Sequence, residues 1–100
     1  CIICKDKQEI EYLQEHSLII NRFDVLDETK EMSNNKNIIT TIINSKGVEF
    51  DMVVIPFAND NNYKTELDRN LLYVASTRAL HNLCFIADKK PSRFLTKQNS

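Results

Sequence analysis

Residues 38–55 read IITTIINSKGVEFDMVVI, two apolar runs separated by a polar loop. The runs, 38–43 and 52–55, are continuous and rich in β-branched residues. Such runs are typical of strands covered on both faces, as in a parallel sheet with helices on both sides. The loop, 44–51, is shorter than a usual crossover between parallel strands, so we expect a short helical turn at 48–51 to complete the connection.

Gly47 is the only glycine of the chain. A lone glycine is a candidate for a backbone conformation that other residues rarely adopt, or for close approach of the backbone to a ligand. Lys46 and Glu49 stand beside it with opposite charges. From this loop alone, an ordinary polar turn between two buried strands is the simpler interpretation.

Strand and helix also alternate toward the amino end. A buried strand is expected at the start of the chain, ending at Cys4. Asp6 is placed to cap a helix that reaches about residue 16, with Glu9 as its capping-box partner. Residues 17–20 are a candidate for a short strand.

The carboxyl half continues the same pattern. A long helix is predicted from Glu66 or Asp68 to about Leu80, and a final strand over 81–87, which Pro91 prevents from continuing. Together, the predicted strands and helices indicate an α/β fold around a mainly parallel sheet.

The predicted long helix places an arginine among apolar side chains. At about 100° per residue, Arg78 falls inside the apolar face, whose other members are Leu67, Leu71, Leu72, Val74, Ala75 and Ala79. A guanidinium stays charged, so burial is costly unless an anion meets it. Two interpretations follow. In the first, Arg78 extends to solvent or pairs with an internal carboxylate. In the second, packing anchors Arg78 so that its guanidinium can bind a phosphate. Arg69, on the polar side of the same helix, is the weaker rival of Arg78, with a surface ion pair as the alternative interpretation.

Composition narrows the class of protein. The 100 residues suffice for one domain, 1–100, with a modest core, and the net charge of −1 argues against a free-standing nucleic-acid binder. The sequence contains no run of about twenty apolar residues, so it predicts no membrane span. No secretory leader is visible. The missing initiator methionine suggests an excised fragment.

The cysteines and histidines do not predict a metal site. Cys1 and Cys4 have zinc-like spacing, but no second ligand pair follows, and His16 and His81 stand apart from them. Three cysteines suit a reducing cytoplasm, and Cys84 is expected to be a small core residue of its strand.

Two segments together resemble a known family. Residues 46–51 are similar to the "KGLEFD" motif of UvrD/Rep-type superfamily 1 helicases, and residues 72–79 are similar to their "YVAxTRA" motif. The resemblance extends over about 37–95. The compact 57–66 connection and the later 91–95 segment look most like the HelD branch, whose members act on RNA polymerase.

The resemblance implies a RecA-like three-layer fold, as part of the second motor domain and truncated at its amino side. It also implies an ATPase site shared with a P-loop domain of the same parent chain, because this sequence lacks GxxxxGK[ST]. ATP would bind with Mg²⁺, held mainly by that missing domain. The isolated fragment would therefore be inactive.

The motif residues receive their roles from the same resemblance. Arg78 matches the arginine that reaches the γ-phosphate from across the cleft, and Glu49 matches the glutamate that accepts a hydrogen bond from the ribose. Gly47 would let the backbone pass close to the nucleotide. Lys46 would hold the loop or face the phosphates, with a solvated lysine as the alternative.

Nucleic-acid contacts are expected just before this motif. Thr41 matches a threonine that contacts single-stranded DNA, and Ser45 is the second candidate. Ile43 departs from the family, because UvrD-like members have a backbone-binding histidine there, and an isoleucine cannot make that bond. Tyr73 and Thr77 match motif positions, although Thr77 could simply bond back to the preceding helical turn.

Three functions remain open at this point. The first is an ATP-dependent DNA helicase or translocase. The second is a HelD-like motor that remodels RNA polymerase without unwinding duplexes. The third is a degenerate structural domain, against which the intact Gly47, Glu49 and Arg78 argue.

Overall fold

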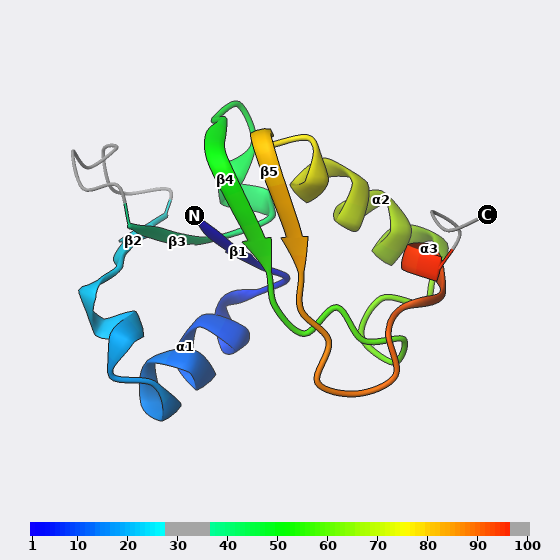
Figure 1. Ribbon diagram of the computed structural model, residues 1–100, viewed down its shortest axis with the longest axis horizontal. Coiled ribbons are helices and arrows are strands. Elements are labelled where there is room, and N and C mark those ends of the chain that lie inside the picture. Colours follow the sequence, from blue (N-terminus) through cyan, green and yellow to red (C-terminus); the bar gives the residue numbers. More distant parts are fainter. Residues whose placement is uncertain (28–36, 97–100) are drawn as a thin grey trace.

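The computed structural model describes residues 1–27 and 37–96, which alternate between strands and helices (Figure 1). In chain order the elements are β1 (Ile2–Cys4), α1 (Lys7–His16), the 3-10 turn η1 (Ile19–Arg22), β2 (Asp24–Leu26), β3 (Ile38–Thr41), the 3-10 turn η2 (Ile43–Ser45), β4 (Phe50–Ile55), α2 (Glu66–Ser76), β5 (Ala79–Phe85) and α3 (Arg93–Thr96). The five strands form one sheet in the order β2-β3-β1-β4-β5. All described pairs of strands are parallel, which confirms the predicted α/β fold.

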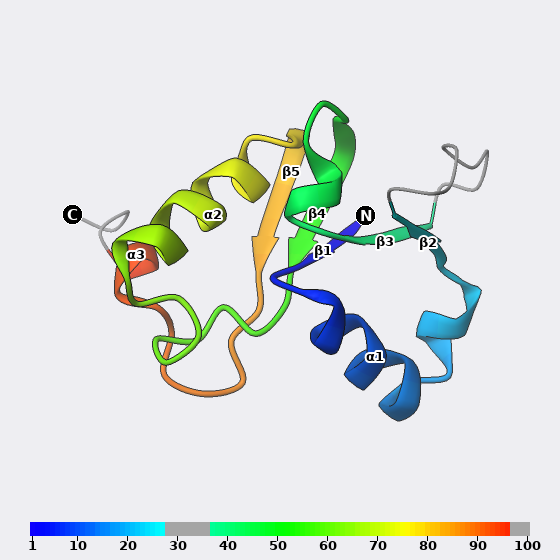
Figure 2. The same cartoon turned by 180° about the vertical axis from the view of Figure 1, so that it is seen from behind.

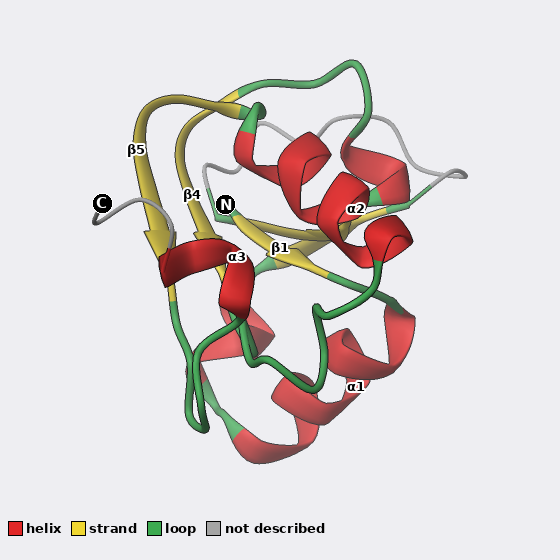
Figure 3. Cartoon of the chain, turned by 90° about the vertical axis from the view of Figure 1, so that its right-hand side faces the viewer, coloured by secondary structure: helices red, strands yellow, loops and turns green. Residues whose placement is uncertain are grey.

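Helices pack on both faces of the sheet, and the two faces have separate apolar cores. On one face Ile10 of α1 and Ile20 of η1 pack with Cys4 and Ile39. The core of the other face joins Leu72 and Ala75 of α2 to side chains of β1, β3 and β4. Figure 3 shows α1 and α2 on opposite sides of the central strands.

Local capping explains where the two longer helices begin. The Asp6 side chain accepts a hydrogen bond from the Glu9 N–H, 3.1 Å, as predicted for α1. The Glu9 carboxylate reaches one residue further back than expected and accepts from the Lys5 N–H, 2.9 Å. In α2, Thr65 and Asp68 form a reciprocal capping box, which satisfies backbone donors at the helix start.

Several predicted boundaries were wrong. Residues 17–20 are not a strand, since residue 18 lies in a turn and the 3-10 turn η1 begins at Ile19. The helical turn between β3 and β4 lies at Ile43–Ser45 rather than at 48–51, because β4 already begins at Phe50. The long helix ends at Ser76 instead of about Leu80, because the chain turns there into β5.

Two predictions of burial were also wrong. Leu67 is 68% exposed, since α2 turns this side away from the sheet. Cys84 is exposed although it lies within β5, one residue before the end of the strand. It sits on a part of the sheet that no described helix covers. Among the described residues, no helix has the length and apolar character needed to cross a membrane.

Candidate functional site

The two predicted motifs meet at the amino ends of β4 and β5. The Phe50 N–H donates a 2.8 Å hydrogen bond to the Arg78 carbonyl oxygen. Phe50 is also paired with Ala79 in the parallel register of the two strands. The turn that carries Gly47 and Glu49 therefore lies beside the residue that precedes β5, although about thirty residues separate them in the sequence.

Arg78 lies beyond the carboxyl end of α2, not on its apolar face as the helical pattern predicted. Its N–H donates to the Ala75 carbonyl oxygen, 3.1 Å, which continues the helix by a short turn. The side chain is half-buried, and Nη2 donates to the Thr77 hydroxyl, 3.1 Å. Packing thus anchors this arginine while part of its fork reaches solvent.

The guanidinium of Arg78 is incompletely satisfied within the chain. Its Nε is buried and has no hydrogen-bond partner among the described residues. Within 1–27 and 37–96, no carboxylate forms an ion pair with Arg78. Pairing with an internal carboxylate, one of the two interpretations of the sequence, is therefore not observed in this part of the chain. An unmet buried donor on a fixed cation is suited to an external anion.

Gly47 adopts a positive φ of 82°, a backbone conformation that other residues rarely adopt. This is one of the two reasons for a lone glycine that the sequence suggests. A Cβ built at this position would meet nothing within 4 Å, so backbone conformation rather than space requires glycine. Lys46 and Glu49 are exposed on the same turn. The Val48 N–H donates to the Ser45 carbonyl oxygen, 3.1 Å, and fixes the turn.

The two nucleic-acid candidates precede the Gly47 turn in the chain and differ in accessibility. Thr41 is half-buried at the carboxyl end of β3, and its hydroxyl accepts from the Asn44 N–H, 3.3 Å. Ser45 is completely buried, and its hydroxyl donates to the Ile42 carbonyl oxygen, 2.7 Å. Ser45 therefore stabilises η2 from inside. Ile43, in contrast, is 66% exposed.

The remaining residues singled out in the sequence are Thr77 and Tyr73 of the second motif and the nearby Arg69. The Thr77 hydroxyl donates to the Val74 carbonyl oxygen, 2.7 Å, so it does bond back to the preceding turn. Tyr73 is largely exposed. The expected surface ion pair of Arg69 is present, with 3.2 Å between its Nη1 and Oε1 of Glu66.

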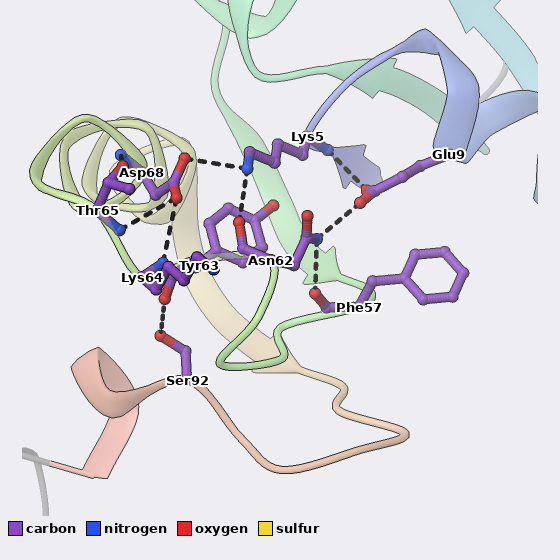
Figure 4. Close-up of polar contacts among 9 residues, drawn as sticks. All are labelled: Lys5, Glu9, Phe57, Asn62, Tyr63, Lys64, Thr65, Asp68 and Ser92. Carbon is purple, nitrogen blue, oxygen red and sulfur yellow. Dashed lines mark hydrogen bonds and ion pairs between the residues drawn. The ribbon is translucent and has the colours of Figure 1, made fainter.

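Sequence reasoning missed a polar network at the opposite end of the strands (Figure 4). Lys5, directly after β1, forms a 3.0 Å ion pair with Asp68 of α2. Its Nζ also donates to the Asn62 carbonyl oxygen and lies 5.3 Å from the centre of the Tyr63 ring. The Thr65–Asp68 capping box follows a pattern that is visible in the sequence. No local pattern indicates that Lys5, which is distant in the sequence, pairs with Asp68.

This network alters the acidity of its members. Burial by itself would raise the pKa of Asp68, but hydrogen bonds from Lys5 and from the Thr65 and Lys64 backbone hold that pKa well below its usual range. Burial raises the pKa of Glu9 despite its bonds to Lys5 and Asn62, and burial also raises the pKa of Tyr63. The network therefore stabilises an ionised Asp68 at the start of α2.

A cavity of about 450 Å³ opens beside the network, at the carboxyl ends of β1 and β4. Its walls come from the start of α1, the β4–α2 loop and the segment after β5, and they are Asp6, Gln8, Glu9, Tyr12, Phe57, Asn59, Asn61, Asn62, Asp88 and Lys89. None of the residues predicted to bind nucleotide or nucleic acid lines it. The residues predicted to contact the nucleotide instead lie at the amino ends of β4 and β5, where Lys46, Gly47 and Glu49 are exposed and Arg78 is half-buried.

Three comparisons with known proteins point to one family. A family model described as "UvrD-like helicase C-terminal domain" matches residues 38–86. Gabija protein GajB of Bacillus cereus (strain VD045) is 38% identical over 88 residues, which are 88% of this chain and 17% of GajB. The crystal structure of the C-terminal domain of a possible DNA helicase from Lactobacillus plantarum WCFS1 has a TM-score of 0.76 and 34% identity, over 94% of this chain and 58% of that one.

This chain thus spans only part of the relatives that it matches. The comparisons give no support to the HelD branch suggested by the 57–66 connection. They agree on the family, and the matched segment contains both motifs and the hydrogen bond that joins them. Residues 38–86 of this chain therefore belong to a UvrD-like helicase C-terminal domain.

Proposed function

We propose that this chain is part of the C-terminal motor domain of an ATP-dependent superfamily 1 DNA helicase or translocase. It would contribute one wall of an ATPase site, and an N-terminal P-loop domain of the same polypeptide would contribute the other. The observation that carries the proposal is the half-buried Arg78, which has an unpartnered Nε and no carboxylate partner among the described residues. A cytoplasmic location follows from this function.

Arg78 is the proposed catalytic residue. A transferring phosphoryl group carries negative charge on its outer oxygens, and positioned cations stabilise it in the transition state. The planar fork of a guanidinium can donate paired, charge-assisted hydrogen bonds that an ammonium group cannot reproduce. The Arg78 backbone is hydrogen-bonded to the backbones of Phe50 and Ala75, so the Cα from which its side chain extends is held in place.

The neighbouring turn is the proposed nucleotide contact. The exposed Glu49 carboxylate is available to accept a hydrogen bond from the ribose. The positive φ of Gly47 shapes the turn, and the exposed Lys46 adds positive charge near the phosphates. ATP supplies the phosphoryl group when it is bound with Mg²⁺, and we assign no residue of this chain to the metal.

Single-stranded DNA is the proposed nucleic-acid partner, with Thr41 as its contact. The Thr41 hydroxyl already accepts from Asn44 but retains its own donor. Ser45 contributes by shaping η2 rather than by direct contact, because its hydroxyl is buried. The exposed Ile43 can offer DNA only apolar contact.

The test compares two arginines in the full-length parent protein. Arg78→Ala should lower ATP turnover by roughly 10³-fold or more, as for other arginines that act across an interface. Arg69→Ala is the matched control, because Arg69 lies on α2, the helix that precedes Arg78, and pairs with Glu66 on the surface. It should leave turnover nearly unchanged. Thermal unfolding of each variant checks the fold.

The result is decisive in either direction. If Arg78→Ala turns over ATP at the wild-type rate, or only unfolds, Arg78 is a structural charge and the proposal fails. Arg78→Lys keeps the charge but loses the fork, so it should remain strongly impaired.

The alternative function, HelD-like remodelling of RNA polymerase without duplex unwinding, would use the same ATPase residues. No observation on the described residues favours it. Strong stimulation of the parent ATPase by single-stranded DNA supports the helicase or translocase. Tight binding to RNA polymerase with little stimulation by DNA would support the alternative.

A further inference from the structure

The cavity at the carboxyl ends of β1 and β4 lies where two connections of the chain diverge. From β1 the chain continues into α1 on one face of the sheet, and from the neighbouring β4 it continues into α2 on the other face. Figure 2 shows α1 and the β4–α2 loop at the same end of the sheet, beyond the arrowhead of β4. In open α/β sheets, the crevice between diverging connections is the usual position of a ligand. We call this cavity the end cavity.

Two aromatic rings form part of the wall of the end cavity. Tyr12 of α1 and Phe57, which follows β4, meet edge to face with 5.6 Å between their ring centres. Tyr12 also stacks on His16 and remains half exposed. The volume of about 450 Å³ lies within the range of ligand sites. A ligand in the end cavity would therefore contact aromatic surface.

The backbone of Phe57 is strained, and side-chain hydrogen bonds hold it in place. Its φ is 55°, a value that bulky residues rarely adopt. The Asn62 side-chain amide donates to the Phe57 carbonyl oxygen, 2.9 Å, and to the Glu9 carboxylate, 2.8 Å (Figure 4). Strain of this kind persists only where the surrounding contacts maintain it, and it is frequent at ligand sites. Asn62 thus fixes the aromatic wall relative to α1.

The charged groups of the end cavity determine which sign of charge a ligand can carry. Asp6, Glu9 and Asp88 line it together with a single cation, Lys89. One Asp6 oxygen caps α1, and one Asp88 oxygen accepts from the Asn59 side chain, 2.8 Å. Neither aspartate forms an ion pair within 1–27 and 37–96. The excess of carboxylates would repel a phosphate and attract a cation.

We propose that the end cavity binds the guanidinium group of an arginine side chain presented by a partner protein. A guanidinium keeps its charge, stacks on aromatic rings and donates paired hydrogen bonds to a carboxylate. Tyr12 and Phe57 would supply the stacking surface, and Asp6 or Asp88 would supply the acceptor oxygens.

The shape of the end cavity fits a side chain that remains attached to a polypeptide. Gln8 and Asn61 on its walls are exposed, so the cavity opens to solvent and the backbone that carries the arginine can stay outside. The inference goes beyond the proposed ATPase site, which lies at the other end of β4, and it does not depend on the role of Arg78.

A cysteine in the wall reports whether the end cavity is occupied in the full-length polypeptide. Asn61→Cys supplies an exposed thiol, and its labelling by N-ethylmaleimide is followed by peptide mass spectrometry. The probe is Nα-acetyl-arginine amide, and Nα-acetyl-citrulline amide is its uncharged isostere. At about ten times its dissociation constant, the arginine amide should slow labelling roughly tenfold. The citrulline amide should not, and Asn70→Cys, exposed on α2 away from this wall, should be protected by neither.

Substitutions in the wall test the two parts of the recognition. Tyr12→Ala removes aromatic surface and Asp88→Asn removes a charge, so each should weaken protection of the Asn61→Cys thiol about three- to tenfold. Glu11→Gln is the matched control, because Glu11 is an exposed carboxylate of α1 that does not line the end cavity, and it should leave protection unchanged. Thermal unfolding of each variant checks the fold.

Three results would overturn the proposal. The first is equal protection by the arginine and citrulline amides, or protection by neither. The second is protection by a single-stranded oligothymidylate but not by the arginine amide, which would assign the end cavity to nucleic acid. The third is protection by the arginine amide that Tyr12→Ala and Asp88→Asn leave unchanged, because the bound arginine would then lie elsewhere.

Discussion

The Phe50 N–H and the Arg78 carbonyl oxygen are joined by a 2.8 Å hydrogen bond. This bond connects the turn that carries Glu49 to the segment that carries Arg78, at the first paired residues of β4 and β5. Just beyond it, His81 of β5 and Asp51 of β4 form a second cross-strand contact. The separation of the two proposed nucleotide contacts is therefore set by strand pairing.

Substitution of Gly47 should destabilise the turn through backbone strain alone. At a φ of 82°, Gly47→Ala is expected to cost about 1–2 kcal/mol, although the added Cβ has room. Gly47→Asn should cost less, because asparagine tolerates this region better. Thermal unfolding of the full-length protein measures the order, and equal melting temperatures for both variants and wild type would exclude strain at this position.

The proposed ribose contact predicts a change in ligand discrimination. Glu49→Ala should weaken ATP binding by roughly tenfold, the usual cost of a hydrogen bond to a charged group. The loss should be smaller for an ATP analogue that lacks the contacted ribose hydroxyl, since it never made the bond. Glu66→Ala is the control, because Glu66 is an exposed glutamate paired with Arg69. Equal losses for ATP and every deoxy analogue would contradict the assignment.

Acid should weaken the protein through Asp68. Its pKa is held below the ordinary unfolded-state value of about 3.9, so its stabilising contribution is complete above that pH. The contribution is lost as the pH falls through the folded-state pKa. We expect the melting temperature to fall between about pH 4 and pH 2, and less steeply in Asp68→Asn.

Lys5→Met provides the companion measurement. It leaves Asp68 without its 3.0 Å ion-pair partner, so it should lower stability at pH 7 by about 1–3 kcal/mol. It should also flatten the acid transition. A variant with the full wild-type pH dependence would show that the capping bonds of Thr65 and Lys64, not Lys5, control the acidity of Asp68.

The short α3 should depend on the forked contact of Arg93. Its Nε and Nη2 donate to the two Asp60 carboxylate oxygens at 2.9 and 3.0 Å, and these hydrogen bonds hold the pKa of Asp60 well below its usual range. Arg93→Lys cannot form this two-pronged contact. Amide hydrogen exchange of Ser92 and Leu95 should become faster, while Arg69→Lys, which alters a single exposed contact, should leave it unchanged.

The sequence predicted best where the controlling interactions are local. β-Branched runs predicted β3 and β4, and Asp6 marked the start of α1, because these depend on neighbours within a few residues. The prediction failed for the end of the long helix. Helical periodicity continued through Arg78, yet the pairing of Phe50 with Ala79 ends the helix at Ser76.

The sequence by itself determined the α/β class, the need for a special backbone position at Gly47, and the family resemblance of the two motifs. Only the tertiary structure decided that Arg78 and the Gly47 turn are neighbours, that Ser45 is buried, and that Cys84 faces outward. The physical reason is the range of the interactions. Propensity and capping act within a few residues, whereas strand order, the Lys5–Asp68 pair and the coverage of each sheet face depend on contacts between distant segments.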